Sequence, residues 1–385
     1  MKWLNKGHEF DDVYANILQK KSYYLFGAGD YGRQFYSVFK DEIKITSYID
    51  NASDKHGTYI NGLMCLSLEQ VTLASDIGII VTMSQIARSE PIAQLQSMGL
   101  IRNKDYFIIE EFISIYHVYK YEKVYFSSIS FLPSTACNLK CRHCLNFNPF
   151  AKHFYVREWE DLIRDVDLFF SCVDHIMLFH VSGGEPMLYS RIADLIEYID
   201  TRYGNRIGTL RTVTNGTVIP SDSIVEKLSR CSVEITVDDY RDAVPQYRQN
   251  FDRLLTKLQE HGIKHYVQRV SSWVDLAPER TDYSNFTEEE LIRHRDACSQ
   301  SWQELRDGRL FSCNYAAYAE VAGINGEDAN DSYDLRSYTS DKAKELVEFR
   351  LGFTDKGYSS FCKKCRGFTI YNKNEVLPAG QCAGS

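Results

Sequence analysis

The first part of the chain alternates short apolar runs with longer amphipathic segments, a pattern typical of a small β/α unit. Short apolar runs predict strands, and apolar residues at helical spacing predict the helices between them. We expect strands at 23–26, 43–49, 77–82 and 106–109, and helices at about 30–40 and 87–98. Residues 110–123 are expected to link this unit to the next one.

From residue 124 the alternation becomes longer and more regular. Strand patterns at 124–133, 175–181, 207–214, 232–237 and 264–270 are separated by helical patterns at 159–172, 191–203, 221–231 and 244–261. Strands that alternate with helices indicate parallel β/α architecture. The number of strands favours an open or partial barrel over a small doubly wound sheet.

This rhythm ends after about residue 275. A helix is expected at 287–298, a hairpin around Arg306-Asp307-Gly308-Arg309, and another helix at 341–352. No internal repeat or low-complexity tract interrupts the chain. The last hundred residues therefore predict a third, smaller region outside the regular β/α part.

The composition fits a soluble globular protein, with 44% hydrophobic and 25% charged residues. The net charge of -8 argues against general binding to nucleic acid or anionic membranes, which requires basic excess. Residues 1–10 lack the apolar core of a secretory signal, and the apolar stretch 77–83 is too short to span a bilayer. We therefore expect a cytoplasmic protein, whose cysteine clusters serve metals or catalysis more often than disulfides.

Three of the eleven cysteines, Cys137, Cys141 and Cys144, follow the first strand of the regular part. Three thiolates on a four-iron cluster leave one iron open, and that iron can chelate the amino and carboxylate groups of S-adenosylmethionine (SAM). Electron transfer then breaks a C–S bond and releases a 5′-deoxyadenosyl radical. A structural zinc site and chance spacing are the alternatives, although zinc usually takes four ligands in paired units.

A second motif, Ser182-Gly183-Gly184-Glu185-Pro186, follows the next strand. The two glycines let the backbone approach a ligand, their carbonyls can accept hydrogen bonds from an ammonium group, and Glu185 adds negative charge. Taken alone, the segment is only a turn. Beside the cysteine loop, on the face where barrel enzymes place their sites, it is expected to hold the amino group of methionine.

Together these motifs closely resemble the radical SAM superfamily over about residues 124–275. The resemblance implies a partial (β/α)6 TIM-like barrel, a SAM-binding [4Fe–4S] cluster on the three cysteines, and an external one-electron reductant such as flavodoxin or ferredoxin. It departs from the family at His143, a position that is often aromatic. The residues expected on the SAM side are Gly183, Gly184, Glu185, Pro186, Asn215, Asp238 and Gln268.

Four later cysteines, Cys298, Cys313, Cys362 and Cys365, provide a second set of thiolates for either a zinc ribbon or an iron–sulfur cluster. Behind a radical SAM barrel they resemble the SPASM and twitch extensions. The full SPASM pattern has more cysteines, so the chain is closer to twitch, with one auxiliary [4Fe–4S] cluster. That cluster would accept an electron from a substrate radical, as in an oxidoreductase, or position the substrate. Cys382 has no assigned role.

The N-terminal unit carries Gly27-x-Gly29-x-x-Gly32 between a strand and a helix, with Asp50 about twenty residues further on. This matches the dinucleotide fingerprint, in which the helix N-terminus attracts phosphate. The unit is short for a full Rossmann domain. Its run Ile49-Asp50-Asn51, followed by Gly57 and Gly62, resembles the Rossmann-like N-terminal domain of nucleotide-sugar acyltransferases. The resemblance implies a nucleotide-sugar ligand; a structural or docking role and a working nicotinamide site are the alternatives.

The sequence therefore predicts an α/β protein with a Rossmann-like domain at 1–120, a radical SAM partial barrel at 121–280 and a twitch-like α+β domain at 281–385. We expect an enzyme that abstracts hydrogen from a small substrate, a carbohydrate or nucleotide-sugar, in polysaccharide or natural-product biosynthesis. A maturase of ribosomally made peptides and a non-enzymatic zinc scaffold are the alternatives. The sequence identifies no catalytic acid or base.

Overall fold

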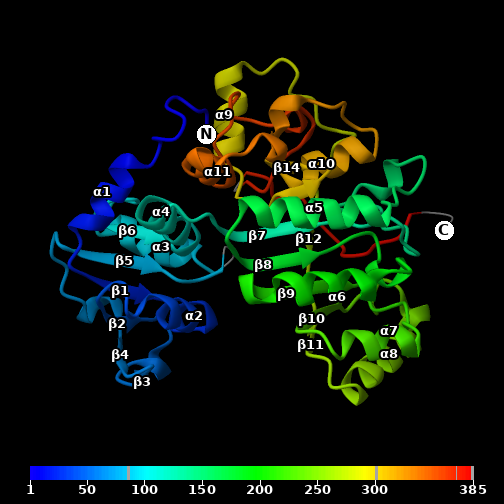
Figure 1. Cartoon of the computed structure of the whole chain (residues 1–385), viewed down its shortest axis with the longest axis horizontal. Coiled ribbons are helices and arrows are strands. Elements are labelled where there is room, and N and C mark those ends of the chain that lie inside the picture. Colours follow the sequence, from blue (N-terminus) through cyan, green and yellow to red (C-terminus); the bar gives the residue numbers. More distant parts are fainter. Residues whose placement is uncertain (85–86, 300–301, 370, 383–385) are drawn as a thin grey trace. The chain divides into compact units, whose positions relative to one another are not determined.

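The computed structural model describes residues 1–84, 87–299, 302–369 and 371–382 (Figure 1). The chain divides into two compact units. The N-terminal unit comprises Asn5–Lys123, and the second unit comprises Met1–Leu4 together with Val124–Ser385. The division of the second unit into a barrel and a C-terminal domain stays a prediction.

The N-terminal unit is a six-stranded sheet in the order β3-β4-β2-β1-β5-β6. Its strands run parallel except for the β3–β4 hairpin, and apolar strand residues such as Phe26 and Ile79 form its core. The strands are β1 (Ser22–Phe26), β2 (Ile45–Ile49), β3 (Tyr59–Ile60), β4 (Leu63–Leu66), β5 (Ile77–Val81) and β6 (Tyr106–Ile108). The helices are α1 (Asp11–Gln19), α2 (Asp30–Phe39), α3 (Ser89–Ser97) and α4 (Ile109–Tyr121).

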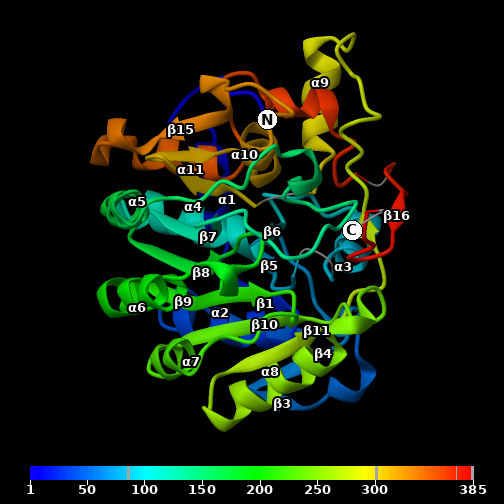
Figure 2. The ribbon, with the colours of Figure 1, turned by 90° about the vertical axis from the view of Figure 1, so that its right-hand side faces the viewer.

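The second unit contains an eight-stranded sheet in the order β11-β10-β9-β8-β7-β13-β14-β15 (Figure 2). Strands β7 to β11 are parallel, as predicted, and a single bridge joins β13 to β7 before the antiparallel strands β14 and β15. The strands are β7 (Tyr125–Phe131), β8 (His175–Val181), β9 (Ile207–Thr214), β10 (Val233–Asp238), β11 (His265–Gln268), β13 (Glu304–Arg306), β14 (Arg309–Phe311) and β15 (Ser332–Asp334). A separate pair joins β12 (Trp273–Val274) to β16 (Glu375–Val376).

Helices connect the parallel strands and pack against one face of this sheet. Phe179 of β8 packs on Phe169 and Phe170 of α5, with ring centroids 5.8 Å apart in each pair. Because neighbouring residues of a strand point to opposite faces, His180 lies on the other, inner face. The helices are α5 (Trp159–Cys172), α6 (Ile192–Tyr203), α7 (Asp222–Leu228), α8 (Arg248–Glu260), α9 (Glu288–Asp296), α10 (Asn314–Val321) and α11 (Ala343–Arg350).

The predicted parallel α/β architecture is confirmed, whereas its closure as a partial barrel stays a prediction. Two segments differ from expectation. Residues 110–123, expected as a linker, form most of the buried helix α4, and the helix α10 was not predicted. Both helices are buried on most sides, so neither shows the single apolar stripe that reveals a surface helix. No helix among the described residues is long and apolar enough to cross a membrane.

Candidate functional site

The carboxyl ends of β7 to β10 lie along one edge of the sheet, and the cysteine loop follows β7 there. Burial raises the pKa of Cys141 to about 12, and the nearby thiols of Cys144 and Cys137 add to the rise. Burial also raises the pKa of Cys137 to about 11, with Glu185 and Cys144 contributing. The three thiols therefore share one small volume, where thiolates require a compensating positive centre.

N–H donors surround these sulfurs. Cys137 Sγ accepts from the Leu139 backbone N–H at 3.4 Å and from Asn215 Nδ2 at 3.7 Å. Cys141 Sγ accepts from Gln381 Nε2 at 3.5 Å, and Cys144 accepts from backbone N–H groups of residues 146–148. Hydrogen bonds to sulfur are among the features that set the reduction potential of iron–sulfur clusters. The residues present therefore fit such a cluster.

The described residues contain no group of three or more His, Cys, Asp or Glu side chains placed to hold one metal ion. An iron–sulfur cluster needs a different arrangement of ligands from a single metal ion. Each cysteine thiolate binds its own iron, so the sulfurs stand around the cluster and do not meet at one point.

The glycine motif packs directly on the chain that leads into Cys137. The Gly184 N–H donates to the Ser134 carbonyl at 2.9 Å, and the Glu185 N–H donates to the Ala136 carbonyl at 2.8 Å. A Cβ atom on Gly184 would collide with the backbone of Thr135 and Ala136. This close approach requires glycine at position 184 and fixes the motif beside the cysteine loop. Gly183 precedes Gly184 in the motif, and Pro186 begins a short 3-10 turn.

Glu185 is 1% exposed, and its carboxylate ties two loops together. It accepts hydrogen bonds from the Asn215 N–H at 2.7 Å and from the Met187 N–H at 3.0 Å. Burial raises its pKa to about 7. The prediction that its charge faces a ligand stays a prediction. The contacts give Glu185 a positioning role between the ends of β8 and β9.

Replacing Glu185 with glutamine is expected to lower the free energy of unfolding by about 1–3 kcal/mol, because an amide nitrogen would face a buried backbone N–H. Urea denaturation of the cluster-free protein measures this loss. Glu289→Gln is the matched control, since its side chain is 87% exposed. Equal stability of both variants would show that the Glu185 contacts contribute nothing.

Asn215 belongs to a polar network beside Cys137. Asn215 Nδ2 donates to Asn138 Oδ1 at 3.1 Å, and Asn138 Nδ2 donates to Thr217 Oγ1 at 2.8 Å. The Thr217 N–H donates to Asn215 Oδ1 at 3.0 Å, which closes the network. Sequence reasoning identified Asn215 and missed the other two residues, which only the folded loops bring together.

Asp238 lies at the end of β10, where Tyr240 joins it to the cysteine loop. Tyr240 Oη donates to Asp238 at 2.8 Å, and burial raises the pKa of Asp238 to about 6. Burial, Asp238 and the thiols of Cys141 and Cys144 raise the pKa of Tyr240. Gln268 is the β11 partner of Asp238, but it is exposed. Sequence reasoning missed Tyr240.

The C-terminal residues 380–382 pair with the cysteine loop. The Arg142 N–H donates to the Gly380 carbonyl at 2.7 Å, and the Cys382 N–H donates to the Lys140 carbonyl at 2.8 Å. Burial raises the pKa of Cys144, and the nearby Cys382 thiol raises it further, whereas several backbone N–H donors act to lower it. Cys382 therefore lies at the first cysteine set, a position that its distance along the sequence did not reveal.

Gln381 donates to the Cys141 sulfur and accepts from the Lys140 N–H at 2.9 Å. Gln381→Ala removes both bonds, so we expect a reconstituted cluster to release its iron roughly 10-fold or more faster to a chelator, as for other lost outer contacts of metal ligands. Release is followed by the absorbance of an iron chelate. Lys373→Ala, at an exposed residue of the same segment, is the control. Identical release rates would contradict a role for Gln381.

The four later cysteines line one cavity in the second unit. Cys313 is the N-cap residue of α10, and Cys362 lies in the 3-10 turn Ser360–Lys364. The Gly367 N–H donates to Cys365 Sγ and the Phe368 N–H donates to Cys298 Sγ, both at 3.3 Å. The structure therefore brings together all four residues that the sequence grouped.

Arg295 of α9 lines the same cavity and was missed by sequence reasoning. Its guanidinium donates to the Ser312 carbonyl at 3.5 Å. Burial acts to lower the pKa of Arg295, but Cys298, Cys313 and Cys362 outweigh it and raise that pKa. A cation that faces several thiols offsets part of their negative charge.

In the N-terminal unit, the glycine loop follows β1 and Gly29 is the N-cap residue of α2. A Cβ atom on Gly32 would collide with the Gly27 carbonyl, so α2 can approach β1 only with glycine there. Asp50 is 9% exposed and accepts from the Ala28 N–H at 3.0 Å and from Lys55 at 2.8 Å. Asp50 therefore holds the glycine loop in place, and its contact with a ligand stays a prediction.

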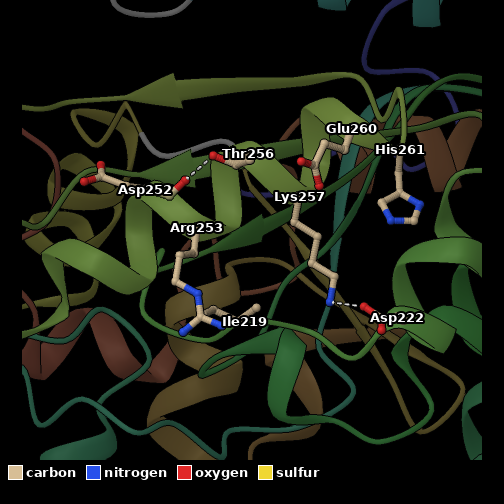
Figure 3. Close-up of a pocket in the computed structure, with 8 residues that line it drawn as sticks. All are labelled: Ile219, Asp222, Asp252, Arg253, Thr256, Lys257, Glu260 and His261. Carbon is tan, nitrogen blue, oxygen red and sulfur yellow. Dashed lines mark hydrogen bonds and ion pairs between the residues drawn. The ribbon is translucent and has the colours of Figure 1, made fainter.

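A further pocket lies on the surface beside α7 and α8 (Figure 3). Its charges partly pair within the pocket, since Lys257 Nζ lies 2.6 Å from Asp222 Oδ1. None of the sequence-predicted site residues lines it. The lining residues are Ile219, Asp222, Asp252, Arg253, Thr256, Lys257, Glu260 and His261.

Residues 131–274 match the family model of the Radical SAM superfamily. This match supports the class of protein that the cysteine and glycine motifs indicated. A comparison with curated proteins found no match.

Among solved structures, the chain is similar to BtrN in complex with AdoMet and 2-DOIA, at 16% identity and a TM-score of 0.40, over 66% of this chain and 97% of that one. It is similar to anSMEcpe with bound AdoMet and Kp18Cys peptide, at 18% identity and a TM-score of 0.31, over 47% of this chain and 52% of that one. It is also similar to Streptococcus suis SuiB bound to precursor peptide SuiA, at 18% identity and a TM-score of 0.30, over 58% and 44%. The match thus spans about half of anSMEcpe.

Proposed function

We propose that the protein is a radical SAM enzyme whose first cluster is held by Cys137, Cys141 and Cys144. When bound, a [4Fe–4S] cluster and SAM supply the electron and the cleavable bond from which a 5′-deoxyadenosyl radical arises. The observation that carries the proposal is the convergence of three thiols, one buried and two partly buried, beside the glycine motif, with N–H donors around them. This arrangement lies within the segment that matches the superfamily.

The chain's own residues orient and shield that chemistry. Glu185 fixes the loop after β8 to the loop after β9, and the Asn138–Asn215–Thr217 network steadies the polar side of Cys137. Tyr240 packs beside the three cysteines, and the C-terminal residues 380–382 pair with the cysteine loop, so both shield part of it from water. A dry site strengthens the hydrogen bonds to the thiolates and protects a radical from side reactions.

The second part of the proposal is an auxiliary [4Fe–4S] cluster at Cys298, Cys313, Cys362 and Cys365. Four thiols in one cavity and the facing Arg295 support it. The four cysteines would hold this cluster, which would supply an acceptor for one electron from a substrate radical; the net reaction would then be an oxidation. An external flavodoxin or ferredoxin would supply electrons to the first cluster in the cytoplasm.

For the substrate, we propose a carbohydrate in the form of a nucleotide-sugar. The glycine loop after β1 and the packing of Gly32 support a nucleotide-binding domain. The experiment measures 5′-deoxyadenosine formed by the reduced protein with a panel of nucleotide-sugars and with peptides. Stimulation by a nucleotide-sugar supports the proposal, and stimulation by peptides alone identifies a peptide maturase instead.

A further inference from the structure

A row of polar side chains crosses the inner face of the eight-stranded sheet at one level. Directly paired residues of neighbouring strands project from the same face. The pairs are Glu304 with Ser130, Ser130 with His180, His180 with Arg211, and Arg211 with Glu234. Figure 2 shows their strands stacked from β7 to β10. This face is opposite to the one that packs on α5, so the row does not belong to the core between the sheet and α5.

One end of the row is satisfied within the protein. Glu304 accepts from the Leu132 N–H at 2.9 Å and from the Tyr318 hydroxyl at 3.1 Å. The Ser130 and Tyr318 hydroxyls lie 2.6 Å apart, and Ser130 is 3.0 Å from the hydroxyl of Ser182. These side chains therefore require no ligand.

The middle of the row is not satisfied. Among the described residues, His180 Nδ1 and Arg211 Nε are buried atoms without a hydrogen-bond partner. Each such atom costs about 1–3 kcal/mol if nothing binds it. The edge contact between His180 and Trp302, with ring centroids 5.4 Å apart, holds the imidazole in place. Two neighbouring strands thus present unpaired nitrogens from one face at one level.

The charge beside these nitrogens is positive. Arg211 Nη2 lies 3.2 Å from Glu234, but Glu234 is also paired with Lys264 and accepts from the Tyr266 hydroxyl at 3.3 Å. One carboxylate is therefore shared between two cations. Burial, and then the charge of Arg211, lower the pKa of His180 to about 4, so the imidazole adds no charge near neutral pH. The missing partner of Arg211 Nε–H is an acceptor, and the surplus cation favours one with negative charge.

We propose that Arg211 and His180 bind an oxyanion of the substrate, a carboxylate or a phosphate, on the inner face of the sheet. The inference rests on the proposed function, since it names the chemistry of the substrate in the same unit. His180 lies three residues before Gly183, which is roughly 10 Å along a strand. A sugar anchored here by its oxyanion would extend toward the edge where the radical forms.

Calorimetric titration of the full chain with inorganic phosphate, glucuronate and glucose tests the inference. We expect at least one of the two anions to bind and neutral glucose not to bind. Binding of phosphate alone identifies a phosphate group, and binding of glucuronate alone identifies a carboxylate. If neither anion binds, or if glucose binds equally well, the inference is wrong.

Arg211→Gln should weaken anion binding at least about tenfold, the loss expected for one charge-assisted hydrogen bond. Arg293→Gln, at a residue whose side chain is 68% exposed, should leave it unchanged. If Arg211→Gln does not fold, Arg211→Lys keeps the charge and removes Nε, and weaker binding is again expected. Equal binding by these variants and the control overturns the inference. SAM cleavage by the wild-type protein is measured in parallel, because its absence contradicts the proposed function and leaves the titration intact.

Discussion

Replacing Cys141 with alanine is expected to reduce 5′-deoxyadenosine formation to background. Cys141 is 9% exposed, and the thiols of Cys144 and Cys137 are near enough to contribute to the rise of its pKa. Two thiolates cannot hold the three irons that a SAM-binding cluster leaves to the protein, so the variant would lose the cluster or would no longer hold it in the position that SAM cleavage requires. The measurement is chromatography of 5′-deoxyadenosine after reduction of the anaerobically reconstituted protein.

Cys231→Ala is the matched control, because this cysteine lies after α7, outside both cysteine sets, and its thiol donates to the Lys227 carbonyl at 3.4 Å. The control should cleave SAM as the wild type does. A Cys141→Ala variant that still forms 5′-deoxyadenosine would show that the first cluster is assigned to the wrong cysteines.

Replacing Arg295 with methionine is expected to lower the reduction potential of the auxiliary cluster. The half-buried guanidinium lies near three of the four thiols, and a nearby positive charge stabilises the more negative, reduced state of a cluster. Removing it should shift the midpoint by roughly 60 mV or more, which is a tenfold change for a one-electron couple. Potentiometric titration followed by electron paramagnetic resonance measures the shift.

Arg293→Met supplies the control for this shift, since it removes the same charge from an exposed position of α9. Its potential should match that of the wild type. A potential that rises in Arg295→Met, or that moves equally in both variants, would contradict the placement of Arg295 beside the cluster.

The regular strands and helices of the second unit could be predicted from the sequence because each buries one face and exposes the other. The α5 helix and the β8 and β9 strands match the predicted ranges. Two kinds of element could not be predicted. The helices α4 and α10 are buried on most sides and lose their periodic signal. The hairpin of β3 and β4 consists of strands too short to produce a pattern.

In the site, too, the residues of local motifs could be predicted, whereas residues distant in the sequence could not. The cysteine loop and Gly183–Pro186 could be recognised because each is a short local motif. Gln381 and Arg295 could not, because each contacts cysteines that only folding brings near, and a glutamine or an arginine has no distinctive local pattern. His180 and Arg211 became visible only through the strand register that pairs them.

The most direct test of the account combines metal analysis and SAM cleavage in one anaerobic preparation of the wild-type chain. The account predicts about eight irons with equal sulfide, for two four-iron clusters, and reductive conversion of SAM to 5′-deoxyadenosine and methionine. A preparation that holds zinc and no iron, or one that holds the iron clusters and leaves SAM intact, would contradict it.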